Sequence, residues 1–221
     1  METIIHKVVV DSRLHKLNND NSDYDYRGIF TVPLIEIISP FRRQKNTSWI
    51  EGKDDDTSFE LINFVRMATS GNPTVLEILW SDMIIESSVL GAILVDQKWH
   101  LLDTERIYKA HLGYSFNQQK KMDLYNPDPI RTPKTICAYI RALRQGTQLL
   151  YTGNFDTEYN YPDRDFLLEI KYDYKRSMVG RVSELMQQAR QELEEAYTKT
   201  TLVLKPNFEW IENFLLSAYN A

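Results

Sequence analysis

Two aspartates, Asp23 and Asp25, lie one residue apart at the start of a segment that is rich in aromatic and β-branched residues. On a β-strand, residues i and i+2 point to the same face, so these two carboxylates would lie side by side. Their mutual repulsion falls when a divalent cation sits between them. Mg²⁺ is typically held by one or two carboxylates together with substrate phosphates. The pair is therefore suited to hold a metal ion for phosphoryl or nucleotidyl transfer.

The elements that must position this pair can be read from the surrounding sequence. Residues 4–10 predict a buried strand, residues 18–22 a polar turn, and residues 24–32 a second strand that ends before Pro33. Strand, short turn and strand suggest an antiparallel pair, or a pair separated by one short helical turn. A third strand is predicted over residues 47–51.

Helices dominate the rest of the chain. Thr57 and Glu60 have capping-box spacing and begin a predicted helix over 58–70, which Gly71-Asn72-Pro73 ends. A short helix follows over 75–80, and from about residue 99 the chain reads as mostly helical. Apolar residues at helical spacing predict helices over 133–150, 181–198 and 208–219. We therefore expect an α+β fold, with an α/β part over 1–95 and a helical part over 96–221 that packs closely on it.

Composition excludes several classes of function. The chain has 221 residues and a net charge of −5, so it is not a generic nucleic-acid coat, although one local basic site could hold an RNA end or a nucleotide. A single cysteine excludes an internal disulfide framework and a cysteine-built zinc site. The N-terminal residues do not read as a signal peptide, and apolar runs are too short to cross a bilayer. We expect a cytoplasmic protein with no membrane partner.

Four short motifs follow one another along the chain in the order that is typical of a known protein family. Asp11-Ser12-Arg13 follows the first strand, Ser22–Gly28 contains the aspartate pair, Asp55 precedes the capped helix, and residues 71–79 read Gly-Asn-Pro-Thr-Val-Leu-Glu-Ile-Leu. This pattern, which runs from about residue 6 to beyond 200, resembles the predicted nucleotidyltransferases of the DNA polymerase β superfamily that occur in bacteria and phages and are associated with RNA repair. The resemblance implies a minimal nucleotidyltransferase core over 1–95 and a helical substrate- and nucleotide-binding domain over 96–221.

The resemblance also implies roles for individual residues. Asp23 and Asp25 match the metal-binding pair, and Asp55 matches a third carboxylate that helps bind the metal and accepts a proton from the attacking hydroxyl. Asp54 and Asp56 would point to the other face of the strand. Ser12 matches the phosphate-binding serine, and the further candidates for nucleotide and phosphate binding are Arg13, Lys16, Lys134 and Arg141. The implied reaction is in-line attack of a hydroxyl, on an RNA end or a protein, at the α-phosphate of a nucleoside triphosphate with Mg²⁺ or Mn²⁺.

The sequence departs from the family pattern at the phosphate cradle, the turn over residues 11–16 that would bind the phosphates of the nucleotide. Asp11 and Lys16 stand where the family has glycines, which let backbone N–H groups approach phosphate. The Asp11 charge would cost from about 1 kcal/mol in water to about 4 kcal/mol at an effective dielectric of 20. Lys16 could offset part of this by pairing with Asp11 or touching phosphate. Two functions follow: an active nucleotidyltransferase, which the three retained carboxylates favour, or a degenerate homologue that binds RNA, a nucleotide or a protein.

Other candidates are weaker. On the helix over 133–150, Lys134, Ala138 and Arg141 lie on one face. Ala138 stands where the family commonly has histidine. Lys134, Arg141 and Arg144 would form either a basic strip that binds phosphates or an ordinary solvated face. The four histidines lack metal-site spacing and are expected to be surface or capping residues. Cys137 is expected to be buried, and Tyr24 and Tyr26 to pack in the sheet or to stack on a base.

Overall fold

The computed structural model describes residues 2–41, 46–50, 55–158 and 161–220, with the side chains of 49, 50 and 55 left outside this description. The chain forms two compact units. The first unit contains Met1–Ser70, Thr74–Leu102 and Lys205–Ala221, and the second contains Gly71–Pro73 and Asp103–Leu204. The end of the chain thus returns to the unit that holds its beginning.

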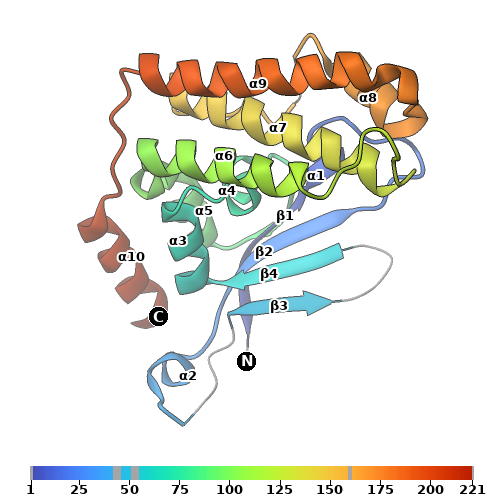
Figure 1. Cartoon of the computed structure of the whole chain (residues 1–221). Coiled ribbons are helices and arrows are strands. Elements are labelled where there is room, and N and C mark those ends of the chain that lie inside the picture. The colour runs from blue at the N-terminus through green and yellow to red at the C-terminus, as the bar shows by residue number, and fades with distance from the viewer. Residues whose placement is uncertain (1, 42–45, 51–54, 159–160, 221) are drawn as a thin grey trace. The chain divides into compact units, whose positions relative to one another are not determined.

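A mixed sheet forms the centre of the first unit (Figure 1). In the described residues it has five strands in the order β3 (Thr47–Ile50), β4 (Asp55–Glu60), β2 (Asp25–Thr31), β1 (Thr3–Val10) and β5 (Ile84–Ser87). Strand β2 pairs antiparallel with β1 and parallel with β4, whereas β1–β5 and β3–β4 are antiparallel. The α+β class predicted from the sequence is confirmed, as are the three strands predicted over residues 4–10, 24–32 and 47–51, within the described residues.

The helices of the first unit follow the strands closely. Several of their apolar faces are buried, as in α3, where Leu61, Phe64, Val65 and Ala68 lie in the core. The helices are α1 (Asp11–Leu14), α2 (Leu34–Ile38), α3 (Leu61–Thr69), α4 (Pro73–Trp80), α5 (Val89–Asp96), the 3₁₀ helix η1 (Lys98–Leu101) and α10 (Phe208–Asn220).

The start of α3 differs from the predicted capping box. Thr57 lies inside β4, and the N-cap is Glu60, whose carboxylate accepts hydrogen bonds from the backbone N–H groups of Ile62 and Asn63 at 2.9 and 3.3 Å. The capping-box prediction was wrong because β4 continues through Thr57 and runs directly into α3, so the last strand residue, Glu60, is the N-cap. Glu60 is fully buried and also accepts a hydrogen bond from the Tyr219 hydroxyl, which fastens α10 to this corner.

The predicted end of α3 is confirmed. Gly71 follows the C-cap Ser70 with a φ of 75°, in the left-handed region that glycine adopts without strain. A Cβ on Gly71 would come within 2.8 Å of the Arg106 backbone. Glycine is therefore required here both by backbone conformation and by space.

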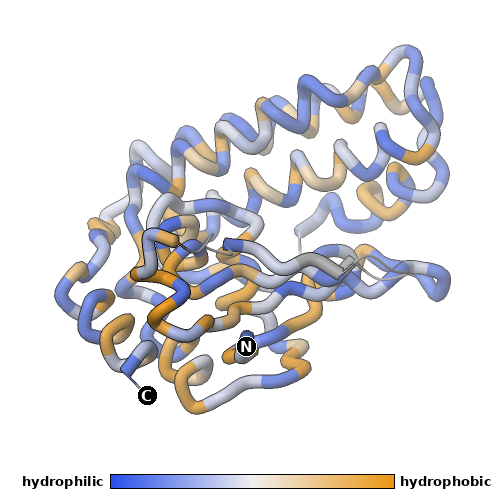
Figure 2. Tube along the Cα trace, turned by 90° about the horizontal axis from the view of Figure 1, so that it is seen from below, coloured by the Kyte–Doolittle hydropathy of each residue, from blue (hydrophilic) through white to orange (hydrophobic). Residues whose placement is uncertain are grey.

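The second unit is helical and is built around α7 (Arg131–Thr152). Helices α6 (Thr104–Gln119) and α9 (Val179–Lys199) pack on it, and Figure 2 shows apolar and polar segments alternating along the long helices. Close packing centres on Gly146 of α7, where a Cβ would lie 2.8 Å from His111 Cγ and 2.9 Å from Leu193 Cδ1. Helix α8 (Arg164–Asp173) and the 3₁₀ helix η2 (Arg176–Met178) complete the unit. No described helix has the length and apolarity to span a membrane.

Candidate active site

The end of β1 and the starts of β2 and β4 meet at one end of the sheet. Val10, the last residue of β1, pairs with Asp25, the first residue of β2, and Asp25 pairs with Asp55, the first residue of β4. Helix α1 begins immediately after Val10, so the turn that carries Ser12 leaves the sheet at the same end. Asp23 is exposed two residues before β2, and Asp25 is half-buried. The register thus brings the three predicted aspartate positions and the predicted phosphate-binding turn to one sheet end.

The chemistry of this acidic set fits a hard divalent cation. Asp23 and Asp25 offer carboxylate oxygens, and Mg²⁺ is commonly bound by one or two carboxylates plus substrate phosphates. Among the side chains that the structure describes, no three His, Cys, Asp or Glu residues gather as a metal cluster; the side chain of Asp55 is outside that set. Among the described side chains, Asp23 and Asp25 therefore fit a site in which two carboxylates and the substrate phosphates together bind the cation.

The opposite face of the strands carries a different set of charges. Lys7 Nζ lies 2.5 Å from Asp56 Oδ2 and 5.3 Å from the centre of the Tyr26 ring. Because Tyr26 alternates with Asp25 along β2, this ion pair places Asp56 on the face opposite Asp25, as expected. Asp54 lies outside the described residues.

The predicted cradle turn keeps an unusual backbone. Asp11 and Lys16 have φ values of 56° and 54°, and they are the non-glycine residues with positive φ in the described part of the chain. The N–H of His15 donates to the Asp11 carbonyl at 3.1 Å, and the N–H of Leu17 donates to the Ser12 carbonyl at 2.9 Å, which closes the turn. Ser12 is 9% exposed, whereas Lys16 is exposed. The two positions where the resemblance implies glycine are thus the two that adopt a glycine-like conformation.

Arg13 fastens this turn to the segment before β2. Its guanidinium donates from Nε to the Asp23 carbonyl at 3.2 Å and from Nη2 to the Ser22 carbonyl. The guanidinium carbon also lies 3.8 Å from the centre of the Tyr24 ring, which stacks on Tyr26 with ring centres 6.0 Å apart. Arg13, predicted to bind phosphate, is therefore engaged with the backbone that carries Asp23. The two tyrosines stack on each other.

Three of the four histidines are buried, contrary to the prediction that they are surface or capping residues. His6, His15 and His111 are each 1% exposed. His6 Nδ1 lies 3.0 Å from Ser87 Oγ, and His15 Nε2 lies 3.1 Å from Glu77 Oε1. Spacing argued against a metal site but carried no signal for burial. His6 and His15 depend on partners distant in sequence, whereas His111 Nδ1 lies 2.8 Å from the Ile107 carbonyl one turn earlier in α6.

The predicted basic strip lies on α7 in the second unit. Lys134 is exposed, and Arg141 is 8% exposed. Arg144 is 5% exposed and forms ion pairs with Asp163 and Glu192, so its charge has protein partners within the unit. Cys137, on the same helix, is buried as predicted.

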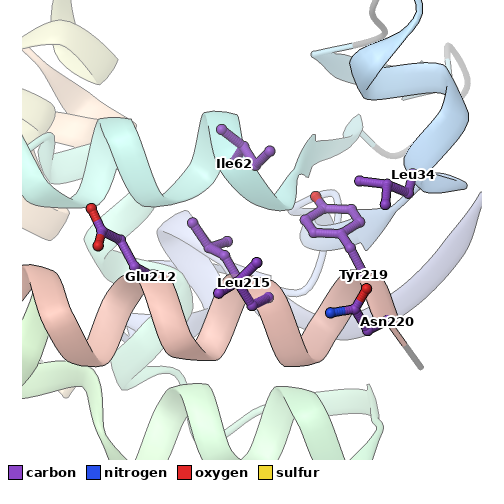
Figure 3. Close-up of a pocket in the computed structure, with 7 residues that line it drawn as sticks. Leu34, Ile62, Glu212, Leu215, Tyr219 and Asn220 are labelled. Atoms are coloured by element: carbon purple, nitrogen blue, oxygen red, sulfur yellow. The ribbon is translucent and has the colours of Figure 1, made fainter.

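An apolar pocket lies at the far end of the sheet from the aspartates. It has a volume of about 420 Å³ and is lined mainly by Leu34, Ile62, Leu215, Leu216 and Tyr219 (Figure 3). Leu34 follows the end of β2 and Ile62 follows the end of β4, whereas Asp25 and Asp55 begin these strands. Strands of six or seven residues separate the two ends by about 20 Å. The pocket is therefore separate from the acidic site.

Comparisons with known proteins identify the family of this chain. Residues 2–217 match the model of the family described as the RNA repair pathway DNA polymerase beta family. The chain is also 25% identical over 223 aligned positions to the uncharacterized protein MJ0002 of Methanocaldococcus jannaschii, an alignment that covers 94% of this chain and 90% of that protein. The family has a polymerase-β-type fold, and its description supports a nucleotidyltransferase-type role. Since the family model covers almost the whole sequence, the chain belongs to the RNA repair pathway DNA polymerase beta family.

Proposed function

We propose that this protein is a metal-dependent nucleotidyltransferase that moves a nucleoside monophosphate from a nucleoside triphosphate to a hydroxyl acceptor. The observation that carries the proposal is the pairing of Asp25 with Asp55 beside the turn that holds Ser12. The RNA-repair description of the family favours an RNA end over a protein hydroxyl as the acceptor.

Each residue at the sheet end has a role in this proposal. Asp23, Asp25 and Asp55 would hold Mg²⁺ or Mn²⁺, which when bound neutralises charge that develops on the transferring phosphate. The Ser12 hydroxyl and the turn backbone would bind phosphate oxygens. As the acceptor oxygen attacks the α-phosphorus, Asp55 would accept the hydroxyl proton and pyrophosphate would leave.

Two of the predicted cations, Lys134 and Arg141, belong to the second unit. Lys134 is exposed on α7, and Arg141 lies about two turns further along the same face; both are candidates to bind the triphosphate or the acceptor backbone. Lys16, exposed at the end of the cradle turn, is a third candidate. Because Arg144 already pairs with two carboxylates, it is not included.

The test is transfer of label from α-phosphate-labelled nucleoside triphosphates to total RNA and protein with Mg²⁺ or Mn²⁺. Asp25→Asn removes a proposed metal ligand with little change of shape and is expected to abolish labelling. Asp96→Asn, an exposed aspartate at the end of α5, is the matched control and should label normally. Equal labelling by the Asp25→Asn form would overturn the proposal. No labelling by any form, with RNA binding that Lys134→Glu weakens, would favour a binding protein instead.

A further inference from the structure

Glu77 of α4 lies at the centre of a buried polar network in the first unit. Its side chain is 4% exposed, Oε1 lies 3.1 Å from His15 Nε2, and Oε2 lies 3.2 Å from Arg27 Nη1. Arg27 Nη1 also donates to the Thr74 carbonyl at 3.1 Å, which ties the guanidinium to the first turn of the same helix. The two carboxylate oxygens of Glu77 thus bind two different segments of the chain.

These two segments are the halves of the candidate active site. His15 closes the cradle turn three residues after Ser12. Arg27 lies two residues after Asp25 on β2, so it extends from the same face of the strand as Asp25. A shift of the Glu77 side chain would therefore be transmitted both to the phosphate-binding turn and to the strand that begins with a proposed metal ligand.

We propose that Glu77 is a positioning residue that holds the cradle turn and the aspartate strand in register with each other. This inference rests on the proposed function. The network suits the role because an ionised carboxylate can accept from both partners at once and because burial leaves it few alternative positions. Changes to buried residues that orient metal ligands typically weaken metal binding by about 10- to 100-fold.

The variant Glu77→Gln tests the proposal with little change in side-chain volume. The amide has a single oxygen acceptor, so it can no longer accept from both His15 and Arg27 through separate oxygens. The probes are Mn²⁺ alone, followed by electron paramagnetic resonance, and inorganic pyrophosphate, followed by calorimetry. Glu86→Gln, at an exposed position of β5 in the same unit, is the matched control, and urea unfolding measures stability for each form.

The expected result is about tenfold weaker binding of both probes by Glu77→Gln and unchanged binding by Glu86→Gln. A lower unfolding midpoint with both affinities kept would show that Glu77 only stabilises the fold and would overturn the proposal. Absence of Mn²⁺ and pyrophosphate binding by the unmodified protein would overturn the proposed function and this inference with it. That outcome is distinct, because it appears before any substitution is made.

A second variant keeps the test decisive if Glu77→Gln does not fold. Arg27→Lys keeps the positive charge, but the lysine side chain ends one bond short of Nη1, the nitrogen that contacts both Glu77 and the Thr74 carbonyl. We expect weaker Mn²⁺ binding with a smaller effect on pyrophosphate, since the His15 contact remains. Unchanged Mn²⁺ binding in this variant would contradict the proposal.

Discussion

Asp11 and Lys16 both have left-handed backbone conformations, with φ values of 56° and 54°, at the two ends of the turn that contains Ser12. Left-handed conformations cost most L-residues roughly 1–2 kcal/mol, and aspartate tolerates them better than lysine does. The chain therefore retains the shape of a glycine-bearing phosphate turn while carrying side chains that make this shape costly. We regard this retained shape as support for a working cradle.

The conformation predicts a gain in stability when glycine replaces Lys16. Relief of left-handed strain should exceed the entropic cost of glycine, so Lys16→Gly should raise the free energy of unfolding by up to about 1 kcal/mol, with a smaller gain for Asp11→Gly. Urea unfolding measures both. Asp20→Gly, at a turn position without positive φ, is the matched control and should not stabilise. A loss of stability in Lys16→Gly would contradict the strain argument.

The charge of Asp11 predicts a separate effect on phosphate binding. Asn tolerates the left-handed conformation as Asp does, so Asp11→Asn removes the charge while keeping the turn. Loss of repulsion worth about 1 to 4 kcal/mol corresponds to roughly fivefold to a thousandfold tighter binding of pyrophosphate. Calorimetric titration with pyrophosphate, at two salt concentrations, measures this. Equal affinity in the two forms would show that the Asp11 carboxylate does not face the phosphates.

His6 predicts a loss of stability in mild acid. Burial lowers the pKa of His6 below its usual value of about 6.5, and the backbone of Ile78 offsets part of that effect. Between the folded and unfolded pKa values the unfolded chain binds more protons. The contribution of neutral His6 to the free energy of unfolding is therefore complete above about pH 6.5. It falls as the pH decreases below that value, by at most about 1.4 kcal/mol per pH unit.

Urea unfolding at pH 7.5, 6.5 and 5.5 measures this dependence. His6→Gln cannot bind the proton, so its free energy of unfolding should fall less between pH 6.5 and 5.5 than that of the unmodified protein. An identical fall in both forms would show that His6 does not carry the effect.

Two helix glycines predict opposite responses to the same substitution. A Cβ on Gly146 would lie 2.8 Å from His111 Cγ, so Gly146→Ala should destabilise the second unit by about 1–3 kcal/mol. A Cβ on Gly180 of α9 would meet nothing within 4 Å, so Gly180→Ala should stabilise by about 0.5–1 kcal/mol. Thermal unfolding of both variants measures the difference. Equal effects would contradict the close packing of α7 against α6 and α9.

Much of the fold could be predicted because local patterns agree with it. The apolar spacing of Val182, Leu185, Met186 and Leu193 predicted the long helix α9, and β-branched residues predicted β1. Strand β4 was missed over residues 57–60 because the helical pattern of the following residues extended across Glu60. Strand β5 was missed because its four residues are exposed and show no alternation of burial.

The site could be predicted only in part. Asp23 and Asp25 are neighbours in sequence, so their spacing carried the signal. Glu77, 50 residues after Arg27 and 62 after His15, gave no local sign of its contacts, although it lies within the motif of residues 71–79. Arg13 was predicted to bind phosphate because its motif suggested it, and only the structure places its guanidinium on the carbonyls of Ser22 and Asp23.

The most direct test of the central claim compares nucleoside triphosphates labelled at the α- and γ-phosphates. Transfer of a nucleoside monophosphate predicts label on RNA from the α-phosphate only, with release of one pyrophosphate for each labelled end and loss of both signals in Asp25→Asn. Label from the γ-phosphate would instead indicate phosphoryl transfer, and it would contradict the assignment of the Asp23, Asp25 and Asp55 site to nucleotidyl transfer.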